Sequence, residues 1–206
     1  MLVVAIAKGR LLELSLELFA KAGIHFADNV QASRKLIFDA KDGNHRIVLV
    51  KPSDVSTYVE YGAADAGIAG LDVLMESGAD VVQPLGLKFG YCRIAVAAQK
   101  GVKSLAGSEP PTVRVATKYP NITMEFFNSR GIPVEIIPLN GSIELAPLVG
   151  LADRIVDLVE SGQTLKENGL EIVEVIAESS ARLIVNRASY QIKRAAVLNF
   201  IEAIKQ

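Results

Sequence analysis

One short segment combines residue types that suit the binding of a phosphate group. Ser161-Gly162-Gln163-Thr164 follows an apolar, β-branched stretch at Ile155–Val159. The two hydroxyls can donate hydrogen bonds, the glycine allows close approach of the backbone, and the free N–H groups at a helix start attract an anion. The segment therefore predicts a site for a phosphomonoester. The alternative is a serine that caps an ordinary surface helix.

Asp157 lies near the end of the stretch that leads into this loop. Its carboxylate could accept hydrogen bonds from ribose hydroxyls. It could also hold Mg²⁺ together with pyrophosphate oxygens, because Mg²⁺ is usually bound by few carboxylates and by substrate phosphates. The acid followed by Ser-Gly-x-Thr resembles the loop with which phosphoribosyltransferases hold phosphoribosyl pyrophosphate.

Three turns carry cations that could meet a polyphosphate. Lys8-Gly9-Arg10 follows the apolar run Val3–Ala7, at the end of a predicted strand where open α/β sheets bind their ligands. Ser33-Arg34-Lys35 and Lys51-Pro52-Ser53-Asp54 offer further cations and hydroxyls. Each has a plainer interpretation: a solvated basic turn, a charged strand edge, or an acid favoured by the helix dipole.

Composition excludes several other classes of protein. The formal net charge of −1 argues against binding of duplex nucleic acid through bulk charge. A single cysteine, Cys92, permits no intrachain disulfide, and His25 and His45 lack the spacing of a zinc site. No apolar run approaches the ~18 residues of a membrane span, and the N-terminus lacks the pattern of a signal peptide. We therefore expect a soluble, cytoplasmic protein without a membrane association.

The elements that must position these residues alternate between strands and helices. This order predicts an α/β fold with a largely parallel sheet. The expected helices are 11–23, a segment starting at Ser53, Leu71–Glu76, Asn121–Arg130 and a single closing helix over Ser189–Ile204. The expected strands are Val3–Ala7, Arg46–Val50, Ala66–Ala69, Val81–Leu87, Ile94–Ala98, Arg114–Thr117, Val134–Pro138, Ile155–Val159, Glu171–Ile176 and Arg182–Asn186.

A faint internal duplication divides the chain into two halves. VVAIAKGR at 3–10 resembles VRVATKYP at 113–120, an offset of 110 residues, and both halves later carry Gly-x-Ala-Asp, ending at Asp65 and Asp153. These two acids have turn duties as often as ligand duties. We expect two similar α/β lobes with a central cleft, where ligands are commonly bound. The first lobe would span 1–90 and about 177–206, and the second would span 91–176.

Together these segments resemble the catalytic subunit of ATP phosphoribosyltransferase, the enzyme family of the first step of L-histidine biosynthesis. The resemblance rests on AKGRLLE (7–13), SRKLIF (33–38), KPSDVSTYVEYGAADAGIAGLDVL (51–74), GYCR (90–93), ATKYPN (116–121), GSIELAPLVGLADRIVDLVESGQTLKENGL (141–170) and SSARLIVNR (179–187). It implies a fold like a type II periplasmic binding protein. The length implies the short form, which works as a homodimer within a hetero-oligomer with a regulatory subunit similar to histidyl-tRNA synthetase.

The resemblance also implies a reaction and roles for single residues. The phosphoribosyl group of phosphoribosyl pyrophosphate would be transferred to N1 of ATP, with release of pyrophosphate and with Mg²⁺ as cofactor. The expected catalytic residues are Lys8, Arg10 and Arg34. The expected contacts to phosphoribosyl pyrophosphate are Glu144, Asp153, Asp157, Ser161, Gly162, Gln163 and Thr164, with Asp157 also at the metal. The expected contacts to ATP are Gly9, Lys51, Ser53 and Asp72.

Some features depart from the family pattern or leave alternatives open. Gln163 stands where the loop often carries a basic residue, Ala7 where Pro or Ser is common, and Lys51 where Arg is frequent. A solute-binding module of the same shape, and a phosphoribosyltransferase acting on another base, are the two rival functions. Release of pyrophosphate from a mixture of ATP and phosphoribosyl pyrophosphate would exclude the first rival. Replacing ATP with other purines or with quinolinate would separate the second.

Overall fold

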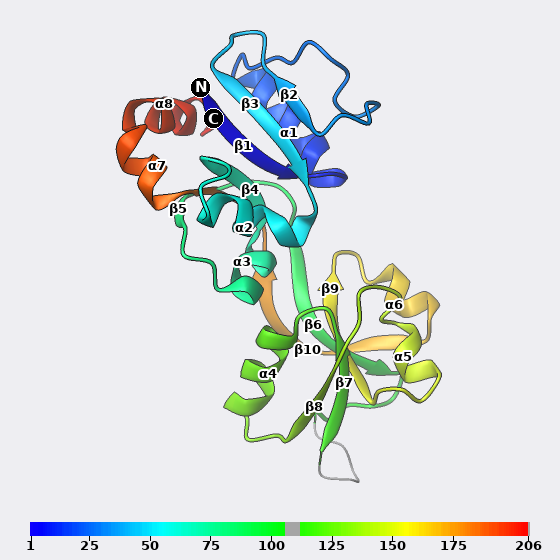
Figure 1. The fold of residues 1–206 in the computed structure, drawn as a ribbon. Coiled ribbons are helices and arrows are strands. Elements are labelled where there is room, and N and C mark those ends of the chain that lie inside the picture. Colours follow the sequence, from blue (N-terminus) through cyan, green and yellow to red (C-terminus); the bar gives the residue numbers. More distant parts are fainter. Residues whose placement is uncertain (106–111, 206) are drawn as a thin grey trace. The chain divides into compact units, whose positions relative to one another are not determined.

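The computed structural model describes residues 1–105 and 112–205. The chain forms two compact units, Met1–Gly90 with Ser180–Gln206, and Tyr91–Ser179 (Figure 1). Each unit has its own sheet with helices on both faces. Within the described residues, no helix has the length and apolar character needed to cross a bilayer.

The sheet of the first unit has six strands in the order β2-β3-β1-β4-β11-β5. Its strands are β1 (Leu2–Ala7), β2 (Ile37–Asp39), β3 (His45–Val50), β4 (Ala66–Gly70), β5 (Val82–Gly86) and β11 (Ala181–Val185). Its helices are α1 (Arg10–Lys21), α2 (Val55–Glu60), α3 (Leu71–Ser77), α7 (Arg187–Ile192) and α8 (Arg194–Ile204), and a 3₁₀ turn (Pro52–Asp54) precedes α2.

Alternation along β1 explains the layers of this unit. Leu2, Val4 and Ile6 join one hydrophobic core with residues of α1 and α8. Ala5 and Ala7 join a second core with residues of α2 and α3. Successive side chains of a strand point to opposite faces of a sheet, so β1 is buried from both sides and the unit has three layers.

The sheet of the second unit has five strands in the order β10-β6-β9-β7-β8. Its elements are β6 (Cys92–Gln99), β7 (Val113–Thr117), α4 (Pro120–Ser129), β8 (Val134–Pro138), α5 (Leu145–Leu148), β9 (Arg154–Val159), α6 (Gln163–Glu167) and β10 (Leu170–Ser179). Val115 joins the core on the side of α4, and Ala116 joins the core on the side of α5 and α6. This unit therefore has the same layered plan.

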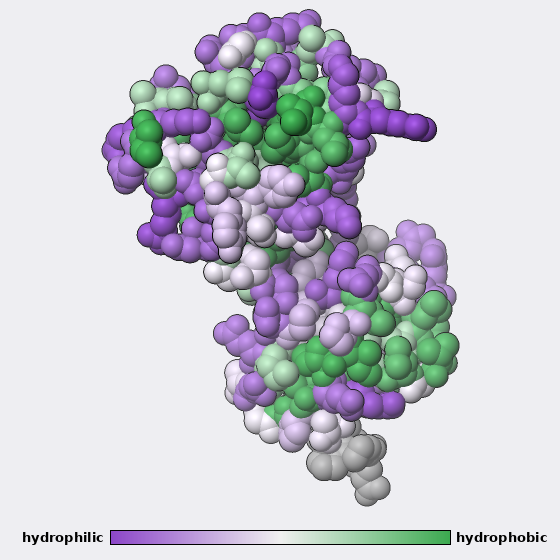
Figure 2. Space-filling model, viewed as in Figure 1, coloured by the Kyte–Doolittle hydropathy of each residue, from purple (hydrophilic) through white to green (hydrophobic). Residues whose placement is uncertain are grey.

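One face of the second unit carries exposed hydrophobic side chains. They gather over α5 and the segment that follows it (Figure 2). The large hydrophobic residues exposed on α5 and this segment are Leu145, Leu148, Val149 and Leu151. Contiguous apolar patches on a protein surface commonly mark contacts with other proteins.

Two expectations about the elements were wrong. The sheets are mixed, because β11 is antiparallel to β4 and β6 is antiparallel to β9, and only three neighbouring strands in each sheet are parallel. The closing helix is two helices that part at Lys193, whose φ of −105° and ψ of 27° leave the helical region. The Lys193 ammonium donates to Asp65 Oδ2 over 2.7 Å, a tertiary bond that the helix period could not indicate.

The predicted duplication has a counterpart in the pairing of the strands. The parallel trio β3-β1-β4 in the first unit matches β8-β7-β9 in the second. Asp65 N–H donates to the Val3 carbonyl while its Oδ2 accepts from Val3 N–H. Asp153 makes the same two bonds with Arg114. By these bonds Val3 corresponds to Arg114, an offset of 111 residues, one more than the similarity of the letters gives.

Candidate active site

Most residues predicted for the site in the first unit lie at one edge of its sheet. β3, β1 and β4 are neighbours and run parallel, so their carboxyl ends lie side by side. Lys8 follows β1, Lys51 follows β3, and α3 with Asp72 follows β4. Ligands of open α/β sheets bind at this edge.

Arg34 reaches the same edge from the opposite direction. β2 is antiparallel to β3, and the Leu49 N–H donates to the Leu36 carbonyl over 2.8 Å. The residues just before β2 therefore lie beside the end of β3, where Lys51 follows. The Arg34 side chain is exposed. The topology thus gathers a cation that sequence alone could place only on a separate turn.

The turn from β1 into α1 depends on Gly9. Its φ of 103° belongs to a region that residues with a Cβ rarely adopt. The Gly9 carbonyl accepts the Leu12 N–H at 2.9 Å, which begins α1. Lys8 and Arg10 on either side are exposed. The turn presents two cations beside the N-terminus of a helix of 12 residues, an arrangement that suits a polyphosphate.

The other two predicted ATP contacts differ in accessibility. Ser53 is exposed, and its hydroxyl donates to Asp54 Oδ1 over 2.8 Å. Asp72 is only 6% exposed, and its carboxylate folds back over the Gly70 backbone. Ser53 can therefore meet a ligand directly, whereas the Asp72 carboxylate is buried against the turn at the start of α3.

A second edge of the same kind forms in the second unit. β8, β7 and β9 are neighbours and run parallel. Beyond their carboxyl ends lie Glu144 at the start of α5, Lys118 directly after β7, and the loop 160–163 into α6. Asp157 is on β9 close to this end. The edge therefore combines the carboxylates of Asp157 and Glu144, the ammonium group of Lys118 and the predicted phosphate loop.

The carboxyl group of Asp157 is electrostatically unusual. Burial raises its pKa above the ordinary value, and the negative charge of Glu144 raises it further. A hydrogen bond from the Leu158 N–H, at 2.8 Å, and the positive charge of Lys118 act in the opposite direction. The ionised carboxylate is thus held at an energetic cost, which a cation or hydroxyl donors from a bound sugar would relieve.

The loop between β9 and α6 has a backbone that its glycine makes possible. Gly162 has a φ of 77°, in the left-handed region. Ser161 Oγ accepts the Gln163 N–H at 3.3 Å, and Gln163 Nε2 donates to Glu167 Oε1 at 2.7 Å. Thr164 is exposed. Ser161, Gly162 and Thr164 therefore suit a phosphate, while the amide of Gln163 already has an intrahelical partner.

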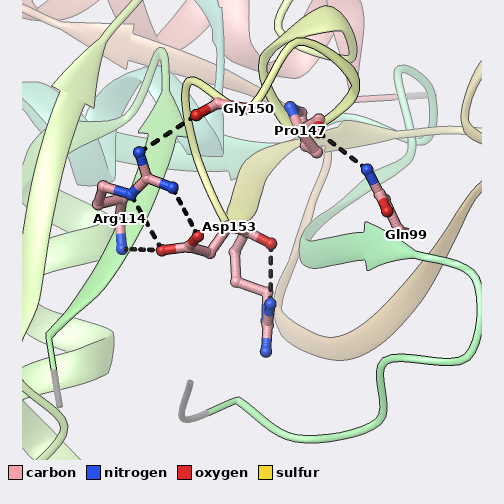
Figure 3. Close-up of polar contacts among 6 residues, drawn as sticks. Gln99, Arg114, Pro147, Gly150 and Asp153 are labelled. Atoms are coloured by element: carbon pink, nitrogen blue, oxygen red, sulfur yellow. Dashed lines mark hydrogen bonds and ion pairs between the residues drawn. The ribbon is translucent and has the colours of Figure 1, made fainter. Parts of the chain in front are cut away.

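Asp153 lies at the other end of β9 (Figure 3). Its carboxylate accepts from the Arg114 backbone N–H at 2.9 Å and from Arg114 Nη2 at 2.9 Å, and Arg114 Nη1 donates to the Gly150 carbonyl at 3.2 Å. The six residues of β9 span about 20 Å at the usual rise of a strand. Asp153 therefore joins β7 to β9 at the edge remote from the phosphate loop.

Lys118 lies at this edge but is not among the site residues predicted from the sequence. The sequence does hold a signal for it, because Lys118 has the same position in the second half of the chain as Lys8 has in the first. What could not be seen from the sequence is that β7 lies between β8 and β9, so that Lys118 comes near Asp157.

Comparisons with known proteins show the family of the chain. The family model HisG, ATP phosphoribosyltransferase, matches residues 51–206. A relative from Geobacter metallireducens named ATP phosphoribosyltransferase is 52% identical over 209 residues, which cover 100% of this chain and 97% of the relative. These matches extend through both units.

Two solved structures show the fold. The ATP phosphoribosyl transferase (HisG:HisZ) complex from Thermotoga maritima matches with a TM-score of 0.87 and 40% identity, covering 100% of this chain and 97% of that one. The alkanesulfonate-binding protein SsuA from Xanthomonas axonopodis matches at a TM-score of 0.56 and 12% identity over 98% of this chain and 71% of that one, a likeness of fold alone. The fold is thus that of type II periplasmic binding proteins, and the chain belongs to the ATP phosphoribosyltransferase family.

Proposed function

We propose that the protein transfers the phosphoribosyl group of phosphoribosyl pyrophosphate to N1 of ATP and releases pyrophosphate, the first step of L-histidine biosynthesis. The family match supports this activity. The observation that carries it is the edge of the second unit, where the loop after β9 meets Asp157 and Glu144. A phosphorylated sugar offers the phosphate and hydroxyl groups that such a set would bind.

The second unit would hold phosphoribosyl pyrophosphate. Ser161, Gly162 and Thr164 would bind the 5-phosphate through hydroxyls and backbone N–H groups, with Gln163 contributing its backbone. Asp157 and Glu144 would accept hydrogen bonds from the ribose hydroxyls. Asp153 would support this unit from the far end of β9 without touching the sugar.

The first unit would supply the nucleotide site and cations for the departing charge. Lys8, Arg10 and Arg34 would stabilise the leaving pyrophosphate, since fixed positive charge suits phosphate oxygens throughout the reaction. Gly9, Lys51 and Ser53 would contact ATP, and Asp72 would hold the turn beside them.

The chemistry needs little proton transfer. N1 of adenine already has a free lone pair, so its attack on the anomeric carbon requires no strong base. The carbon–oxygen bond to pyrophosphate breaks as the new carbon–nitrogen bond forms, through a transition state like an oxocarbenium ion. Catalysis then depends on holding the reactants in line and on stabilising the departing charge.

Enzymes of this family need a metal ion, and we propose Mg²⁺. Within the described residues, no three His, Cys, Asp or Glu side chains form a metal cage. The half-buried Asp157 fits an ion held by one carboxylate and by substrate oxygens, which is the usual coordination of Mg²⁺. When bound, the ion would neutralise charge on the pyrophosphate.

We further propose a homodimer within a hetero-oligomer with a regulatory subunit similar to histidyl-tRNA synthetase. The Thermotoga relative was solved as a HisG:HisZ complex, and this chain covers 97% of that one, which supports the short form. The exposed apolar residues around α5 support contacts with other subunits. We place the reaction in the cytoplasm, where both substrates are metabolites.

Pyrophosphate release tests the proposal. The full chain with its regulatory subunit, Mg²⁺, ATP and phosphoribosyl pyrophosphate should release pyrophosphate in equal amount to the phosphoribosyl-ATP formed. Replacing ATP with another purine or with quinolinate should abolish release. Binding of phosphoribosyl pyrophosphate without turnover would instead favour a solute-binding module, and turnover with another base would favour a different phosphoribosyltransferase.

A further inference from the structure

Lys118 lies at the edge of the second unit where we place the sugar. It directly follows β7, the middle strand of the parallel trio β8-β7-β9. Its side chain is exposed. Among the described residues, the ammonium group of Lys118 forms no ion pair and no hydrogen bond. A cation at the ligand-binding edge of a sheet whose ammonium group forms no ion pair is available to an anionic ligand.

The backbone on both sides of Lys118 is firmly held. The buried Thr117 hydroxyl donates to the Val156 carbonyl of β9 at 2.8 Å and accepts the Tyr119 N–H at 2.8 Å. The buried Thr123 hydroxyl of α4 donates to the Tyr119 carbonyl at 2.6 Å. The turn is thus tied both to β9 and to α4, so Lys118 projects from a fixed point while its side chain stays accessible.

The carboxylates beside Lys118 indicate what kind of anion would fit. Asp157 and Glu144 are near enough to interact electrostatically, and Lys118 opposes the rise in the pKa of Asp157. A ligand that enters this edge must offer hydroxyl donors to the carboxylates and negative charge to the ammonium. A ribose that carries a phosphate group beside its hydroxyls meets both demands.

The chain path indicates which phosphate of the sugar would meet Lys118. The phosphate loop follows β9 and leads through α6 to β10. β10 and β8 are the outermost strands on the two sides of the sheet. Lys118 lies on the other side of Asp157, towards β8. With the ribose at Asp157 and its 5-phosphate in the loop, the pyrophosphate on C1 is the phosphate group that remains to meet Lys118.

We propose that Lys118 binds the pyrophosphate group of phosphoribosyl pyrophosphate and stabilises it as it leaves. This role rests on the proposed function and adds to it a cation from the same unit that binds the sugar. The pyrophosphate would therefore meet a cation of the unit that holds the sugar.

Binding measurements on the full chain with Mg²⁺ test this assignment. Lys118→Ala should weaken binding of phosphoribosyl pyrophosphate and of pyrophosphate by ~10- to 100-fold, the range for loss of a hydrogen bond between charged groups. Binding of ribose 5-phosphate, which lacks the pyrophosphate, should be unchanged. Lys118→Arg should restore most of the affinity for phosphoribosyl pyrophosphate.

Lys100→Ala is the matched control. Lys100 is also exposed, but it follows β6, which runs antiparallel to β9, and so lies at the opposite edge of the same sheet. It should leave all three affinities unchanged. The Lys118→Ala variant must first show a native circular dichroism spectrum. The role of Lys118 would then be overturned if the variant lost equal affinity for ribose 5-phosphate and phosphoribosyl pyrophosphate. It would also be overturned if the variant bound pyrophosphate as the wild type does. If the wild-type chain binds ribose 5-phosphate but not phosphoribosyl pyrophosphate, the proposed function itself fails.

Discussion

Replacing Asp65 with alanine should destabilise the first unit markedly, because this one side chain joins three parts of it. Oδ2 accepts the Val3 N–H of β1 at 2.9 Å and the Lys193 ammonium at 2.7 Å. Oδ1 accepts the Ser189 hydroxyl of α7 at 2.7 Å. The Asp65 side chain is 8% exposed, so water could not replace these bonds without rearrangement.

The size of the loss follows from these contacts. Hydrogen bonds from Val3 and Ser189 to a buried carboxylate contribute ~1 kcal/mol each or somewhat more. The Lys193 side chain is 41% exposed, so solvent screening limits its ion pair to ~1 kcal/mol. We therefore expect Asp65→Ala to lower the free energy of unfolding by about 3 kcal/mol.

Urea unfolding followed by circular dichroism measures this loss. The control is Asp80→Ala, which removes an ion pair to Arg187 of 2.7 Å between side chains that are 65% and 67% exposed. That variant should stay within ~0.5 kcal/mol of the wild type. If Asp65→Ala behaves like Asp80→Ala, the reasoning from buried contacts is refuted.

The contribution of Asp65 to stability should depend on pH. Burial by itself would raise the pKa of Asp65, but the bonds from Lys193, Val3 and Ser189 outweigh it and lower the pKa below its ordinary value. The ionised form is therefore the stabilising one. Its contribution is present above about pH 4, the unfolded value, and is lost as the pH falls through the lowered value. The difference in unfolding free energy between wild type and Asp65→Ala should shrink as the pH is lowered below 4.

Three further substitutions separate the roles of other residues. Asp153→Ala, which removes the ion pair to Arg114, should lower the unfolding free energy of the second unit by ~2 kcal/mol; a KM for phosphoribosyl pyrophosphate raised tenfold would contradict its position remote from the loop. Arg10→Ala should lower kcat/KM in steady-state assays with the regulatory subunit, by an amount that corresponds to ~2–4 kcal/mol of lost transition-state stabilisation. Unchanged turnover would show that Arg10 does not stabilise the leaving pyrophosphate. Thr164→Ala should raise the KM for phosphoribosyl pyrophosphate with little change in the KM for ATP. If the variant and the wild type had the same KM for phosphoribosyl pyrophosphate, the 5-phosphate would have to bind elsewhere.

The parts of the candidate site that depend on local chemistry could be predicted from the sequence. A glycine between two cations after a β-branched run, at Lys8-Gly9-Arg10, and Ser-Gly-x-Thr after another such run, at 161–164, both indicate strand-to-helix turns. The structure has turns at both places, with Gly9 and Gly162 at positive φ. Such turns are encoded within a few residues, because backbone conformation and side-chain type act together there.

Tertiary structure alone decided which of these turns share an edge. Asp153 and Asp157 are four residues apart in the sequence, yet an extended strand carries them to different ends of β9. Arg34, distant from Lys51 in sequence, comes beside it because β2 is antiparallel to β3. Lys118 approaches Asp157 because β7 pairs with β9. Strand pairing depends on contacts between distant segments, and a pattern of residues along one segment does not contain that information.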